Sequence, residues 1–126
     1  MDAKTAGPET QNFKRKSLDE RKEKFAKLQE KNPSKIPIIF ERHAQSKLPE
    51  APTLKFMSTK NLKLSYFANQ IRNSLKLSPE CAVFFSTTGQ KIVKHDVLVG
   101  ELYESGKNED GFLYVQYREV ESFGRC

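Results

Sequence analysis

The sequence lacks the features that mark membrane-spanning, secreted and zinc-binding chains. No apolar run in its 126 residues approaches the roughly 20 that are needed to cross a bilayer. The first nine residues contain no apolar segment of the kind that signal peptides carry. The two cysteines, Cys81 and Cys126, have no C-x-x-C spacing, so neither a disulfide framework nor a zinc site is indicated. We therefore expect a single domain in the reducing cytoplasm.

Signals of catalysis are equally scarce. None of the six glycines belongs to a G-x-G-x-x-G or P-loop arrangement. His43 and His95 lie in polar surroundings without a neighbouring nucleophile pattern, and Cys81 is interpreted as a small buried hydrophobe. We expect no catalytic residue, no metal site and no enzyme. A binding module remains.

The net charge of +6 is distributed unevenly along the chain. Residues 1–35 carry ten Lys/Arg against six Asp/Glu, and residues 36–100 carry nine against four. Residues 101–126 reverse the balance, with three against six. Such a basic surface can meet anionic lipid or an acidic peptide, although a merely solvated face is an equally good interpretation. No stacking-aromatic motif accompanies the basic residues, so we expect no nucleic acid partner.

The N-terminal third predicts a disordered segment followed by a helix. Residues 1–12 are small and polar, and a glycine and a proline interrupt them, which predicts disorder. Residues 13–32 predict a helix that can begin at Ser17, because Ser17 and Glu20 fit a capping box. Pro33 should end it. Its apolar stripe is thin and must dock on a sheet; it consists of Leu18, Phe25 and Leu28.

The remaining sequence predicts a sheet crossed by one main helix. Apolar residues recur at helical spacing across residues 64–75. Short apolar or alternating runs predict the strands, at 36–42, 54–57, 82–85, 91–95 and 111–118, with a short helix at 97–104. This element order predicts an α+β fold, the ubiquitin-like β-grasp. A ferredoxin-like fold is the alternative, but it requires a second long helix that the sequence does not offer.

Strand 54–57 is predicted to lie at an edge of the sheet, because Pro49 and Pro52 precede it. An exposed edge allows an extended peptide to add a strand. Lys55 would then be placed to meet an acidic peptide. A lysine that prevents edge-to-edge aggregation is an equally good explanation.

Several segments together resemble the autophagy ubiquitin-like modifiers, the family of microtubule-associated protein light chain three and the GABA-receptor-associated protein. The resemblance runs from about residue 13 to the C-terminus. The segments that carry it are Asn32-Pro33-Ser34-Lys35-Ile36-Pro37-Ile38-Ile39-Phe40-Glu41-Arg42, Lys55-Phe56, Asp110-Gly111-Phe112-Leu113-Tyr114 and Ser122-Phe123-Gly124.

The resemblance implies a domain organisation and a processing route. Residues 13–124 would form a ubiquitin-like domain with two additional N-terminal helices, after a disordered segment at 1–12. An autophagy cysteine protease would cut the Gly124–Arg125 bond, next to Phe123, and remove residues 125–126. E1-like and E2-like enzymes would then join Gly124 to phosphatidylethanolamine, placing the protein on the autophagosome membrane. No other cofactor is implied.

The resemblance also implies a receptor site for aromatic-x-x-aliphatic segments. The aromatic pocket would be lined by Leu28, Pro37, Ile39, Lys55, Met57 and Phe112. The aliphatic pocket would be lined by Phe56, Phe67 and Ile71. The chain departs from the family pattern at Gln70, which should make the second pocket more polar, and at Asn73 and Ser74, which should weaken a contact with the protease. It also departs at Lys24, where the relatives tend to be acidic, and at Ser58 and Thr59, which bear on receptor preference.

Two functions remain open from the sequence. The first is a lipid-conjugated modifier that recruits receptors to autophagosomal membranes. The second is an unconjugated adaptor whose basic N-terminal helices bind an acidic surface such as tubulin or anionic lipid.

Overall fold

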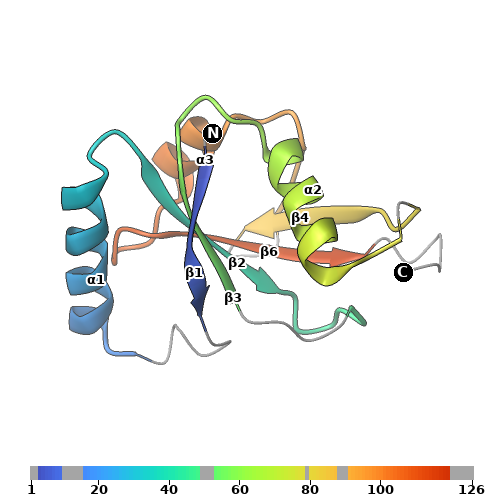
Figure 1. The fold of residues 1–126 in the computed structure, drawn as a ribbon, viewed down its shortest axis with the longest axis horizontal. Coiled ribbons are helices and arrows are strands. Elements are labelled where there is room, and N and C mark those ends of the chain that lie inside the picture. Colours follow the sequence, from blue (N-terminus) through green and yellow to red (C-terminus); the bar gives the residue numbers. More distant parts are fainter. Residues whose placement is uncertain (1–2, 10–15, 49–52, 79, 88–90, 120–126) are drawn as a thin grey trace.

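Figure 1 shows the computed structural model of the chain, which describes residues 3–9, 16–48, 53–78, 80–87 and 91–119. Within these residues the helices are α1 (Leu18–Lys31), α2 (Leu64–Leu75) and α3 (Val99–Gly106). The strands are β1 (Ala3–Glu9), β2 (Ile36–Arg42), β3 (Thr53–Ser58), β4 (Val83–Thr87), β5 (Ile92–Val93) and β6 (Leu113–Glu119).

The strands form one mixed sheet in the order β1-β3-β2-β6-β4-β5. The central pair, β2 and β6, is parallel, with Ile38 opposite Leu113, and the other pairings are antiparallel. Helix α2 crosses over between the β2–β3 hairpin and β4. This arrangement confirms the α+β ubiquitin-like β-grasp that the element order predicted.

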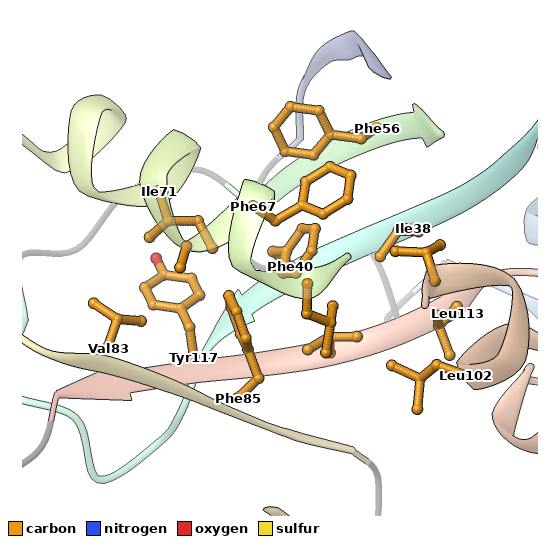
Figure 2. Packing of buried hydrophobic residues seen from close by; sticks show 14 of the residues in the cluster. Ile38, Phe40, Phe56, Phe67, Ile71, Val83, Phe85, Leu102, Leu113 and Tyr117 are labelled. Carbon is orange, nitrogen blue, oxygen red and sulfur yellow. The ribbon is translucent and has the colours of Figure 1, made fainter. Parts of the chain in front are cut away.

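Strand alternation divides the apolar residues between the two faces of the sheet. On one face, Phe40 of β2 lies at the centre of an aromatic cluster, with its ring centroid 5.1 Å from that of Phe67 and 5.5 Å from that of Phe85. Figure 2 shows these rings between the sheet and α2. Of the five residues at the predicted helical spacing, four are buried, namely Leu64, Phe67, Ala68 and Ile71, and the fifth, Leu75, is half-buried.

Helix α1 covers the other face of the sheet, on the left of Figure 1. Its predicted start is confirmed, because the Ser17 side chain accepts a hydrogen bond from the Glu20 N–H at 3.1 Å. It ends at Asn32, before the proline, as expected. Phe25 and Leu28 pack on a small second cluster formed by Ile39, Phe112 and Tyr114. Of the two N-terminal helices that the resemblance implied, the described residues contain one.

The prediction of disorder over residues 1–12 is wrong for the described part of that segment. Residues 3–9 form β1, which pairs antiparallel with β3. The prediction weighed the local breakers Gly7 and Pro8, whereas pairing is decided by a neighbouring strand whose edge is available. The prediction that 54–57 lies at the edge is wrong for the same reason, because β3 lies between β1 and β2.

Cys81 is buried just before β4, with 1% of its surface exposed, and it packs in the larger core. It is also disulfide-bonded. The cysteine spacing did not indicate this bond, because spacing along the chain carries no information on which residues the fold brings together.

Candidate functional site

The register of β2 and β3 brings together most of the residues predicted to line the aromatic pocket. Ile39 lies opposite Lys55, and Pro37 lies opposite Met57. Because side chains alternate along a strand, these four point to the face that α1 covers. All four are buried.

Phe112 completes this group from the turn before β6. Its ring is fully buried and lies edge-on to Phe25 of α1, with 5.9 Å between the centroids. The Lys55 ammonium lies 6.0 Å from the centroid of the Phe112 ring, within the range of a cation–π contact. Leu28 packs against the same cluster and is half-buried. The six predicted residues are therefore neighbours on one face of the sheet.

Lys55 differs from its expectation in one respect. We expected this side chain on an exposed edge, but only 5% of its surface is accessible. Its charge lies over the negative face of the Phe112 ring. A partner carboxylate can therefore reach this charge only if the covering residues move.

Asp110 holds the turn that carries Phe112. One of its carboxylate oxygens, Oδ1, accepts a hydrogen bond from the Phe112 N–H at 2.9 Å. The other, Oδ2, accepts from Nη1 of Arg21 at 2.8 Å and from the Tyr114 hydroxyl at 2.5 Å. The Asp110 side chain is fully buried, so its charge requires these partners. Burial raises the pKa of Tyr114 above its ordinary value, and the bond to Asp110 raises it further, so the phenol stays protonated and donates.

Gly111 lets helix α1 approach the same turn. Its φ of +97° lies in the region that side chains disfavour, and a Cβ placed on it would lie 2.5 Å from Cγ of Phe25. The Phe25 ring therefore rests directly on the glycine backbone. Position 111 must remain without a side chain for α1 to dock as it does.

The residues predicted for the aliphatic pocket lie on the opposite face of β3, in the larger core. The ring centroids of Phe56 and Phe67 are 5.2 Å apart, and Ile71 follows Phe67 by one helical turn of α2. Phe67 and Ile71 are fully buried, and Phe56 is 5% exposed. The two groups of residues predicted to line the pockets thus lie on opposite faces of β3.

Strand β1 occupies that outer edge. Ala3 pairs with Ser58, Lys4 with Met57 and Thr5 with Phe56. In the part of the chain that the structure describes, β3 therefore has no unpaired edge on which another strand could be added.

The end of β6 is anchored shortly before the C-terminal tail. The Ser46 hydroxyl donates to Oε2 of Glu119 at 2.6 Å, and the Lys47 N–H donates to Oε1 at 2.9 Å. Burial opposes ionisation of Glu119, but these hydrogen bonds outweigh it and hold the pKa of its carboxyl below the ordinary value. Phe123, Gly124 and Arg125 lie outside the described residues.

The sequence did not indicate the hydrogen-bonded pairs that stabilise the site. Arg21 stands 89 positions from Asp110, and Ser46 stands 73 from Glu119. No periodic pattern in a single sequence indicates a contact between residues so far apart. Asp110 was noted only as part of a motif, and its role as a buried acceptor depends on the fold.

The described residues also limit metal binding and membrane insertion. They contain no group of three or more His, Cys, Asp or Glu side chains placed to hold a metal ion. They also contain no helix that is both long and apolar enough to cross a membrane.

The chain is similar in sequence and in fold to known proteins. A family model described as autophagy protein Atg8, ubiquitin like, matches residues 20–124. Autophagy-related protein 8d of Arabidopsis thaliana is 34% identical over 107 residues, which cover 85% of this chain and 88% of that protein. Microtubule-associated protein 1 light chain 3 gamma of Homo sapiens is 34% identical over 119 residues, covering 93% and 81%. The crystal structure of Trypanosoma brucei ATG8 matches with a TM-score of 0.78 at 26% identity, covering 88% of this chain and 95% of that one.

Proposed function

This chain belongs to the Atg8 family of ubiquitin-like autophagy proteins, and we propose on that premise that it acts as a lipid-conjugated modifier. Once the disulfide at Cys81 is reduced, a cysteine protease cuts after Gly124 and releases residues 125–126, and E1-like and E2-like enzymes pass the new carboxylate to the amine of phosphatidylethanolamine. The protein then acts by its location on the autophagosome membrane and not by catalysis. Before conjugation it resides in the cytoplasm.

The observation that carries this proposal is where the family match ends. It extends to Gly124 and leaves two residues, Arg125 and Cys126, beyond it. Glycine suits a carboxylate that must enter narrow enzyme channels, because it has no Cβ. Hydrogen bonds of Glu119 fix the end of β6 five positions before Gly124.

On the membrane, the modifier recruits receptors that carry an acidic aromatic-x-x-aliphatic segment. The segment adds a strand to β3, and its aromatic and aliphatic side chains enter the two residue groups that flank this strand. The aromatic side chain of the segment binds beside Lys55 and the Phe112 ring, which are in contact with each other. The acidic residues of the segment pair with Lys55.

The alternative adaptor function receives less support from α1. Within Leu18–Lys31, five Lys/Arg stand against four Asp/Glu, so the helix is nearly neutral. Arg21 is moreover paired with Asp110, and Lys27 lies 3.6 Å from Glu23. This helix has little net charge with which to hold an acidic surface.

A reconstituted reaction tests the conjugation. The full chain is incubated with the protease, the E1-like and E2-like enzymes, ATP and vesicles of phosphatidylethanolamine and phosphatidylcholine, in a reducing buffer. We expect a faster-migrating species on denaturing gels that pellets with the vesicles. Vesicles of phosphatidylcholine alone should give no such product.

Two variants sharpen the assignment. A chain that ends at Gly124 should be conjugated without the protease. The Gly124→Ala variant should not be conjugated either with or without the protease. If wild type and Gly124→Ala pellet equally, binding does not depend on Gly124, and the conjugation proposal is wrong. Pelleting that disappears as salt is raised would favour the adaptor instead.

A further inference from the structure

We propose that β1 competes with receptor peptides for the outer edge of β3, so that a receptor peptide must displace residues 3–9 before it can bind. This inference rests on the proposed receptor docking at β3 and concerns its regulation. β1 lies outside the family match, which begins at residue 20. It is therefore not part of the matched domain.

The competition follows from backbone geometry. A strand has two edges, and each backbone N–H and C=O of β3 points to one of them. The inner edge of β3 is paired with β2, and its outer edge is paired with β1 (Figure 1). A second strand cannot use the same outer groups, so β1 and a receptor peptide exclude each other.

The composition of β1 weakens its pairing with β3, so that another strand can displace it. Its register shifts between Thr5 and Pro8, so three steps along β1 match two steps along β3, from Phe56 to Leu54. Such a bulge interrupts the ladder of hydrogen bonds. Pro8 has no N–H to donate, and Gly7 loses more conformational freedom than other residues on pairing.

The attachment of β1 compensates for this weak pairing. Eight residues separate Glu9 from Leu18, the first residue of α1, and α1 is itself fixed to the domain by Arg21 and Phe25. A short tether keeps a segment at an effective concentration of about a millimolar near its site. A weak strand held in this way remains a competitor, yet a receptor present at sufficient concentration displaces it.

Peptide affinity measures the competition. Calorimetry with the probe peptide Asp-Asp-Asp-Trp-Ser-Ser-Leu would compare the full chain with a chain that lacks residues 1–9. If β1 covers the edge nine-tenths of the time, its removal should lower Kd about tenfold. Equal Kd values in the two chains would overturn the inference. They would leave lipid conjugation, which is measured separately, untouched.

Point variants test the same step in a chain of full length. Thr5→Pro places a residue without an N–H in the paired part of β1 and should tighten peptide binding as the truncation does. Thr5→Val keeps the N–H and suits a strand, so it should bind no tighter than wild type. If Thr5→Pro and Thr5→Val bind alike, pairing of β1 does not control the edge.

Nuclear magnetic resonance of the full chain shows the displacement directly. Saturation with the probe peptide should move the amide resonances of Ala3, Lys4 and Thr5 from strand-like to unstructured positions. A bound peptide that leaves these resonances unchanged would overturn the inference. Absence of peptide binding in both full and truncated chains would overturn it together with the proposed receptor site, even if conjugation succeeds.

Discussion

Nη1 of Arg21 donates a hydrogen bond to Oδ2 of Asp110 over 2.8 Å, although the two residues are 89 positions apart in the chain. The contact ties α1 to the turn that presents Phe112. The Asp110 side chain is fully buried and the Arg21 side chain is 15% exposed. The helix, the turn and the candidate aromatic pocket are thus coupled through one ion pair.

Asp110→Asn should destabilise the protein by about 2–4 kcal/mol, because it leaves a largely buried guanidinium without its counter-charge. Urea unfolding measures the change. Glu23→Gln breaks the exposed contact with Lys27 and is the control, with at most about 0.5 kcal/mol expected. Similar losses in the two variants would show that the Arg21–Asp110 pair has no special role.

Gly111→Ala should weaken the docking of α1. The new Cβ would meet the Phe25 ring at 2.5 Å, and the residue would have to adopt a φ of +97°. We expect a loss of about 1–3 kcal/mol in urea unfolding. Gly106→Ala is the matched control, because a Cβ there would lie 3.8 Å from Leu113, an ordinary contact. Equal stability of the two variants would contradict the close packing of Phe25 on Gly111.

Acid should destabilise the protein partly through Glu119. Its pKa is lowered from the ordinary 4.5 in the folded state, so ionised Glu119 stabilises the fold above pH 4.5. That contribution is lost as the pH falls through the lower, folded pKa. Chemical unfolding at a series of pH values should show a shallower acid decline for Glu119→Gln and for Ser46→Ala. An unchanged decline in both would exclude Glu119 as a contributor.

Lys55→Glu should weaken binding of the acidic probe peptide at least about tenfold, which corresponds to about 1.4 kcal/mol. The change replaces the cation over the Phe112 ring with a carboxylate that repels both the ring and the peptide. Lys94→Glu makes the same charge change on an exposed residue after β5, at the far edge of the sheet. Its Kd should stay within about twofold of wild type, since distant exposed charges are screened. Equal effects would remove Lys55 from the site.

Periodicity predicted those parts of the fold that local patterns encode. The buried face of α2 follows from the spacing of Leu64, Phe67 and Ile71, and the start of α1 follows from the Ser17 cap. These features depend on neighbours within one or two helical turns. The fold class then follows from the order of the elements, whereas the position of β3 within the sheet does not.

The rest of the fold depends on contacts that no local pattern contains. The pairing of β1 runs against its own Gly7 and Pro8, because the open edge of β3 supplies the hydrogen bonds. The acceptors at Asp110 and Glu119 receive donors from distant segments. The residue groups beside β3 were assigned through the family resemblance, and the structure places each group together on its own face of the strand. Peptide binding to them stays a prediction.

Mass spectrometry of the C-terminus, from cells that express the protein naturally, tests the central claim most directly. The account predicts a membrane-bound form whose last residue is Gly124 with phosphatidylethanolamine in amide linkage, and a free form that also ends at Gly124. A membrane fraction that contains only chains ending at Cys126 would contradict it.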